Sequence, residues 1–221
     1  HRYEKPDFGI NQVTCEDKTY PVSESVVKRN TFAQLKHFKK VGNKKQGPKL
    51  LIIAPLSGHF ASLLRGTVKT MLESHDVYIT DWHDCRLIPK EKGDFSLEDQ
   101  ISYIIDFIQY LGDNTHVLAV CQPVVSALSA VALMSENNDV ATPVSLSLMG
   151  GPIDARIDPT VPCKLATDKK LSWFKNRVIH KVPYPNKGAG RKVYPGFLQL
   201  ASFISMNKKS HFSAYKNFHY A

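Results

Sequence analysis

Four strand-like runs are spread through the middle of the chain. They are residues 50–54, 77–79, 116–120 and 145–149. Apolar runs of this length are typical of strands that are buried on both faces of a parallel sheet. Their alternation with helices implies right-handed crossovers, and so the pattern predicts one mostly parallel sheet with helices on both faces.

The segments between these runs carry apolar residues at three- and four-residue spacing, which indicates helices. Such helices are expected over residues 60–72, 94–111 and 122–136. The second has the strongest pattern, because Ser96 can cap its first turn together with Asp99, three residues later. In open sheets of this kind the active groups lie at the carboxyl ends of the strands, so the residues that follow each run are candidates.

The two ends of the chain depart from this alternation. Residues 20–38 carry apolar side chains with polar residues between them, which predicts two antiparallel strands that make the sheet mixed. Beyond Asp154, aromatic residues and prolines become frequent and the strand–helix alternation stops. We therefore expect an α/β core over residues 1–154, with an antiparallel start over 1–48, and a lid- or cap-like insertion over 155–221.

The composition is that of a globular protein. Of 221 residues, 43% are hydrophobic and 22% are charged, which excludes a collagen, a coiled-coil rod and a disordered tail. No apolar run is long enough to span a bilayer. The net charge is +9, with basic residues concentrated in segments 36–49, 164–192 and 208–216. No nucleic-acid-binding signature accompanies them, so we interpret them as solvated basic faces, and residues 187–192 as a mobile basic loop.

The chain has four cysteines, which are widely spread and form no CxxC pair: Cys15, Cys85, Cys121 and Cys163. A zinc site is therefore not expected, and neither a metal nor a cofactor is needed for the chemistry considered below. Two disulfides are possible in an oxidising compartment. A chain of this length does not need them, and we expect free thiols.

Cys121 is the most informative position. It directly follows the run 116–120 and directly precedes a predicted helix, and the residues two positions away on either side are Ala119 and Pro123. A nucleophile elbow needs this arrangement, because the nucleophile sits at the tip of a sharp strand-to-helix turn. The alternative is a buried structural cysteine at a strand end, which is common.

Acyl transfer also needs two backbone N–H donors for the oxyanion. One comes from the residue after the nucleophile, here Gln122, and the other from a loop after an earlier strand. The loop 55–59 has that place in the chain, with Leu56 or Ser57 as the donor. His59, in the same loop, could be catalytic, could line the substrate pocket or could cap the next helix, and the last two are favoured.

Several longer motifs resemble those of the intracellular polyhydroxybutyrate (PHB) depolymerases. The motifs are residues 54–60, 64–67, 76–82, 120–123, 148–154 and 194–199. The resemblance extends over nearly the whole chain, and the motifs come in the same order. It implies an α/β-hydrolase fold and hydrolysis of ester bonds in poly(3-hydroxybutyrate) or its oligomers. Members use a cysteine nucleophile where related lipases use serine, and Cys121 matches that position.

The acid and base of a triad are harder to place. In this fold they follow the nucleophile in the order acid, then base. The candidates after Cys121 are Asp154, Asp158, Asp168, His180, His211 and His219. No strand-like run precedes any of these histidines, and Asp154 more readily shapes a turn. We therefore expect the chain to be a fragment that lacks the catalytic Asp and His and the last strands.

The resemblance also implies a substrate surface and a location. Trp82, Trp173 and Tyr184 could bind an uncharged polyester or could equally be core aromatics; of these, Trp82 is predicted to bind substrate together with His59. The expected partners are a PHB granule or 3-hydroxybutyrate oligomers, with a second fragment of the same protein as a further partner, and not nucleic acid. The resemblance favours the cytoplasm, at polyhydroxyalkanoate granules, over the periplasm or secretion.

Two other functions compete with ester hydrolysis. A non-catalytic protein could bind hydrophobic granules through the aromatic insertion, and such binding would survive replacement of Cys121. A polyester synthase-like acyltransferase uses a similar elbow with a cysteine. It would require coenzyme A thioesters and would release free coenzyme A as a polymer grows.

Overall fold

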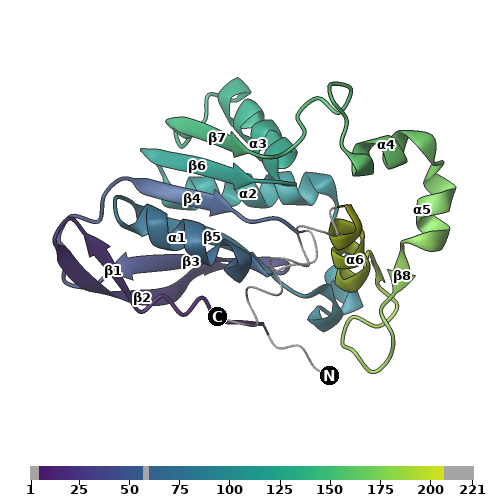
Figure 1. Ribbon diagram of the computed structural model, residues 1–221, viewed down its shortest axis with the longest axis horizontal. Coiled ribbons are helices and arrows are strands. Elements are labelled where there is room, and N and C mark those ends of the chain that lie inside the picture. The colour runs from purple at the N-terminus through teal and green to yellow at the C-terminus, as the bar shows by residue number, and fades with distance from the viewer. Residues whose placement is uncertain (1–4, 57–59, 207–221) are drawn as a thin grey trace.

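The computed structural model describes residues 5–56 and 60–206. Its centre is a seven-stranded sheet in the order β1-β2-β3-β5-β4-β6-β7 (Figure 1). The strands are β1 (Gln12–Cys15), β2 (Lys18–Arg29), β3 (Ala33–Lys40), β4 (Lys49–Ile53), β5 (Asp76–Trp82), β6 (Thr115–Val120) and β7 (Ser145–Met149). The pairs β1–β2, β2–β3 and β3–β5 are antiparallel, whereas β5, β4, β6 and β7 run parallel to one another. This is the mixed, mostly parallel sheet that the sequence predicted.

Helices cover both faces of the sheet, each over its own apolar cluster. They are α1 (Arg65–Leu72), which follows the 3-10 turn η1 (Ala61–Leu64), α2 (Leu97–Leu111) and α3 (Val124–Glu136). On one face α1 packs Val68 and Leu72 with the N-terminal Phe8. On the other, α2 and α3 bury Phe107 and Ala127 (Figure 1). The sheet is therefore a middle layer between two cores.

The predicted cap of α2 is confirmed. The Ser96 hydroxyl accepts a hydrogen bond from the Asp99 N–H at 3.2 Å, and the Asp99 carboxylate accepts one from the Ser96 N–H at 2.7 Å. Each side chain thus satisfies a backbone donor that the first helical turn leaves unpaired.

Two features at the sheet edges differ from the predictions. β1 was not predicted, because it has four residues and buries only Val13. β7 is an edge strand in the described part of the chain, and Ser145, Ser147 and Met149 are exposed along it. The prediction of burial on both faces is therefore right for β4, β5 and β6 and wrong for β7.

The predicted solvated basic segment contains a buried lysine. Lys40 is only 1% exposed, and its Nζ donates to the carbonyl oxygens of Gln46, Leu72 and His75 at 2.7, 2.8 and 2.9 Å. Burial lowers the pKa of Lys40. Because Leu72 ends α1, this ammonium satisfies carbonyls at a helix C-terminus, and the solvated interpretation is wrong for Lys40.

Beyond Asp154 the chain leaves the sheet and forms an arc beside it (Figure 1). The arc contains α4 (Val161–Asp168), α5 (Leu171–Arg177), the two-stranded hairpin of β8 (His180–Lys181) and β9 (Lys192–Val193), and α6 (Gly196–Met206). Two further 3-10 turns of the core, η2 (Cys85–Leu87) and η3 (Lys90–Lys92), lie against the hairpin's loop. Among the helices of the described segments, none is both long enough and apolar enough to cross a bilayer.

The loop 187–192, predicted to be mobile, is anchored on the core. Arg191 is 3% exposed, and its guanidinium donates to the Pro89 carbonyl at 2.7 Å and lies 5.3 Å from the Phe32 ring centroid. Gly188 packs so closely that a Cβ there would lie 2.5 Å from the Cys85 carbonyl oxygen. These contacts tie η2 and η3 to the hairpin, and the prediction of a mobile loop is wrong.

Candidate active site

Cys121 lies at the turn between β6 and α3, with an exposed, free thiol. Its φ of +67° is in the left-handed region, which is uncommon for a residue with a side chain. The Cys121 N–H donates to the Met149 carbonyl at 2.7 Å, and the Cys121 carbonyl accepts from the Val124 N–H at 3.2 Å. A non-glycine residue held in this strained backbone between a strand and a helix has the geometry of a nucleophile elbow.

Gly151 makes that turn possible, a role that the sequence did not predict. A Cβ at this position would lie 2.2 Å from the Cys121 carbonyl oxygen and 2.2 Å from a methyl carbon of Val124. The chain after β7 therefore crosses the elbow at a distance that only glycine permits. The sequence shows a glycine after a predicted strand, but it does not show which residues that glycine packs against.

The two predicted sources of oxyanion donors are adjacent. The Leu56 N–H, after β4, donates to the side-chain Oε1 of Gln122, after β6, at 2.9 Å. The Gln122 N–H itself has no hydrogen-bond acceptor among the described residues. Ser57, the alternative donor, and His59 lie outside the described residues.

Trp82 fixes the backbone that leads into this loop. It is 8% exposed, and its indole N–H donates to the Ala54 carbonyl at 2.7 Å. The Ala54 N–H in turn donates to the Thr80 hydroxyl at 2.9 Å. The peptide groups that lead out of β4 toward Leu56 are thus fixed by two side chains of β5. The structure places Trp82 in the core, and its contact with substrate stays a prediction.

The sequence of the arc matches a known family. Residues 150–221 match the family model described as PHB de-polymerase C-terminus. The matched segment begins after Cys121, so it assigns no role to the thiol. No curated protein matches the chain.

Three solved structures that are similar to this chain share only 12–18% sequence identity with it. A membrane phospholipase A, described as a bacterial virulence factor, shares 16% identity over 89% of this chain and 63% of its own, with a TM-score of 0.47. The N-formylmaleamic acid deformylase from Pseudomonas putida shares 18% identity over 71% of this chain and 55% of its own, with a TM-score of 0.46. An α/β hydrolase from the metagenome of Lake Arreo, Spain, shares 12% identity over 61% of this chain and 45% of its own, with a TM-score of 0.45. The chain thus spans 45–63% of the length of these structures, and their reactions are not transferred to it.

None of the acid and base candidates within the described residues hydrogen-bonds to the Cys121 thiol. Asp154 is instead paired with Arg156, at 2.8 Å between Oδ2 and Nη2, and these hydrogen bonds lower the pKa of Asp154. His180 is exposed on β8. His211 and His219 lie outside the described residues. The identity of the catalytic acid and base stays a prediction.

A shallow recess of about 460 Å³ lies beside the elbow. Its lining runs from Gly150 to Thr160 and includes Pro152, Ile153 and Ile157. Gly151 belongs both to this lining and to the contact with the Cys121 carbonyl. The wall that continues from the backbone of the elbow therefore carries these apolar side chains together with the carboxyl groups of Asp154 and Asp158.

Proposed function

We propose that the chain hydrolyses ester bonds in poly(3-hydroxybutyrate) or its oligomers, with Cys121 as nucleophile. The observation that carries the proposal is the left-handed Cys121 at a strand-to-helix turn, with Leu56 and Gln122 beside it. The match of residues 150–221 to the PHB depolymerase family supports the same substrate.

In the first half of the reaction, the Cys121 sulfur attacks the ester carbonyl carbon and its proton passes to a histidine. The electron pair of the carbonyl moves to oxygen, and the Gln122 and Leu56 N–H groups stabilise the oxyanion. The Leu56 N–H is occupied by the Gln122 side chain in the free protein, so the substrate oxygen must displace this amide oxygen. Collapse breaks the C–O bond, and the alcohol leaves with the proton.

In the second half, water attacks the 3-hydroxyacyl thioester and the same donors stabilise the second oxyanion. The C–S bond breaks, the free acid leaves and the thiol is restored. The apolar side chains of the recess, Pro152, Ile153 and Ile157, suit an acyl chain that carries no charge. The expected location is the surface of a polyhydroxyalkanoate granule in the cytoplasm, with the periplasm or secretion as alternatives.

The test combines turnover and thiol reactivity. We expect Cys121→Ala to abolish hydrolysis of 3-hydroxybutyrate dimers and of p-nitrophenyl butyrate, and to remove the fast-reacting site for iodoacetamide. Cys163→Ala is the matched control, because that cysteine lies on α4 and the same methyl side chain replaces it. An undiminished esterase rate in Cys121→Ala would exclude the proposal.

Two other outcomes distinguish the alternatives. Granule binding without turnover, unchanged in Cys121→Ala, would indicate a non-catalytic binding protein. Release of free coenzyme A together with polymer growth would indicate a synthase-like acyltransferase.

A further inference from the structure

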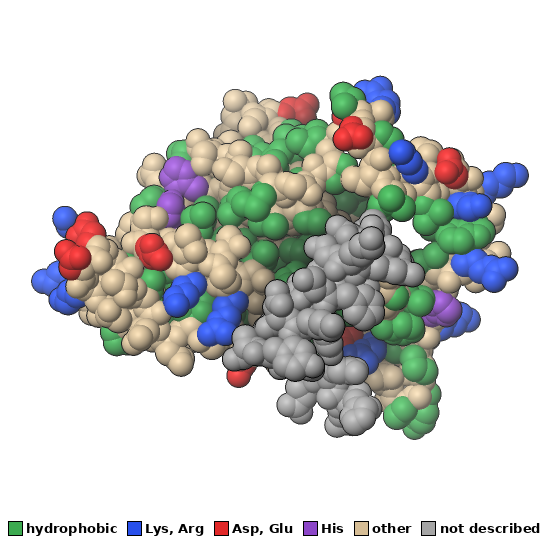
Figure 2. Space-filling model, viewed as in Figure 1, with side chains coloured by type: hydrophobic (Ala, Val, Ile, Leu, Met, Phe, Trp, Pro, Cys, Tyr) green, Lys and Arg blue, Asp and Glu red, His purple; other side chains and the backbone are tan. Residues whose placement is uncertain are grey.

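The charge of the protein is concentrated in one part of the arc. Residues 155–193, here called the basic arm, contain ten Lys or Arg and two Asp, and so carry eight of the nine net positive charges. The remainder of the chain is nearly neutral. Figure 2 shows blue side chains along the outer margin of the arc, whereas blue and red are mixed over the sheet. A charge asymmetry of this size indicates an anionic partner.

The arm also exposes apolar side chains. Neither α4 nor α5 has a buried residue. Ile157 is 74% exposed, Val161 64%, Leu171 68% and Tyr184 89%. Apolar and basic side chains are thus interspersed on helices that bury nothing against the core. This combination is typical of segments that lie in the interface of an anionic lipid surface.

The base of the arm is firmly held. Arg191 hydrogen-bonds to carbonyls of residues 88 and 89, and Val182 is 3% exposed. The arm therefore projects α4 and α5 from a fixed point on the core. A partner that binds these helices would meet a surface that is already formed.

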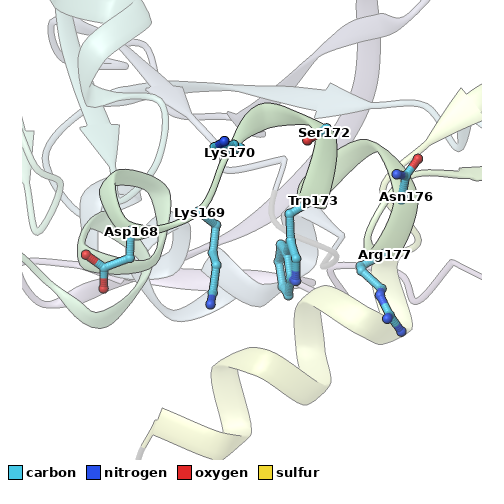
Figure 3. A pocket seen from close by; sticks show the side chains of 7 residues that line it. All are labelled: Asp168, Lys169, Lys170, Ser172, Trp173, Asn176 and Arg177. Carbon is cyan, nitrogen blue, oxygen red and sulfur yellow. The ribbon is translucent and has the colours of Figure 1, made fainter.

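A hollow of about 390 Å³ lies at the junction of α4 and α5. Lys169, Trp173 and Arg177 line it and project from the same side of the chain (Figure 3). None of the carboxylates in the described residues lies within 4 Å of the Lys169 or Arg177 charge. Asp168 also lines the hollow, but neither cation is paired with it, and two unpaired cations beside a partly exposed indole suit a phosphate-bearing headgroup at a lipid–water boundary.

We propose that the basic arm docks the protein on an anionic lipid surface. The cations attract the headgroups, and Trp173 and Leu171 enter the boundary between headgroups and acyl chains. A neutral polyester would not need the nine cations of the arm that remain when the buried Arg191 is set aside. A nucleic acid would not need the exposed Leu171 and Val161. This function is separate from ester hydrolysis and does not depend on Cys121.

The test uses the full chain and two kinds of vesicle, one of phosphatidylcholine and one with about one-third phosphatidylglycerol. Sedimentation with the anionic vesicles alone is expected, and it should weaken as salt shortens the Debye length. A cation near an anionic surface contributes about fivefold in affinity, so K169E/K170E should weaken binding roughly 25-fold or more. K44E/K45E changes the net charge equally at an exposed loop of the core and is expected to bind nearly as the unmodified chain does.

Tryptophan fluorescence gives an independent readout. The chain has two tryptophans, and Trp82 is buried whereas Trp173 is 36% exposed. Anionic vesicles should shift the emission to the blue, and Trp173→Phe should remove the shift. Lys169 and Lys170 are exposed, so K169E/K170E should unfold at the same urea concentration as the unmodified chain, and Trp173→Phe keeps an aromatic ring at its partly covered position.

Three results would overturn the proposal. The first is no sedimentation with anionic vesicles, and the second is an equal loss in K44E/K45E. The third is an arm variant that loses binding to a DNA or RNA oligonucleotide but keeps binding to vesicles. Cys121→Ala is expected to bind vesicles normally, so failure of lipid binding and failure of ester hydrolysis give separate results.

Discussion

The side-chain oxygen of Gln122 accepts a 2.9 Å hydrogen bond from the Leu56 N–H. Leu56 follows β4 and Gln122 follows β6, so this bond links the two loops that are predicted to form the oxyanion hole. It also places an amide oxygen where the carbonyl oxygen of a substrate would have to bind. Gln122 therefore both orders the loop and competes with the substrate.

This dual role predicts a split between kinetic parameters. Gln122→Ala removes the competitor, which should lower KM, and loosens the loop, which should lower kcat several-fold, since a net hydrogen bond contributes about 1 kcal/mol. Gln122→Glu keeps the shape but adds a charge that binds the N–H more strongly and repels the oxyanion. Steady-state kinetics on p-nitrophenyl butyrate should therefore show a larger loss of kcat/KM for Gln122→Glu. Equal losses in both variants would contradict the competing role.

The contact between Gly151 and the elbow predicts that Gly151→Ala disturbs Cys121. The new Cβ would overlap the Cys121 carbonyl oxygen and Val124, and overpacking of this kind costs about 1–3 kcal/mol. We expect a lower free energy of unfolding in urea and a changed alkylation rate at Cys121. Gly66→Ala is the control, because that glycine is in α1 with no neighbour within 4 Å and should be neutral or stabilising.

Lys40 should be essential for stability although it lies in a basic segment. Lys40→Met would leave the Gln46, Leu72 and His75 carbonyls without their donor, at a cost of about 1–3 kcal/mol. Lys39→Met, on the exposed side of the same strand, should change the free energy of unfolding by no more than about 0.5 kcal/mol. Urea unfolding of both variants compares the two positions, and similar effects would show that the buried contacts contribute nothing.

Asp76 should make the protein sensitive to acid. Burial raises the pKa of Asp76. The hydrogen bonds from His37 and Tyr78, at 2.7 and 3.0 Å, lower it by more than burial raises it, so the net pKa is below the usual value of 3.8. A depressed carboxyl pKa stabilises the folded state above the pKa of the unfolded chain, and this contribution is lost as the pH falls through the folded-state value.

The free energy of unfolding should therefore decrease below about pH 4, and Asp76→Asn should make that decrease smaller. Urea titrations from pH 7 to pH 3 measure it. Asp17→Asn, in the exposed turn between β1 and β2, is the control and should leave the acid slope unchanged. A wild-type slope in Asp76→Asn would contradict the assignment.

Much of the core was predictable from local pattern. The apolar runs and the three- and four-residue spacing predicted β4, β5, β6 and the three core helices, because burial against a sheet imposes a period on each element. The same patterns predicted that Cys121 lies between a strand and a helix. The Ser96–Asp99 cap was predictable because both partners lie within one helical turn.

What the sequence determined by itself is the order of strands and helices and the place of Cys121 at the end of one strand. Only the tertiary structure decided that Lys40 and Arg191 are buried, that Trp82 supports Ala54, and that Gly151 crosses the elbow. The reason is physical: a periodic pattern reports which side of an element faces the core, whereas the partner of a cation, an indole N–H or a glycine lies on another element. Those pairs form only when distant segments pack, and no local period encodes them.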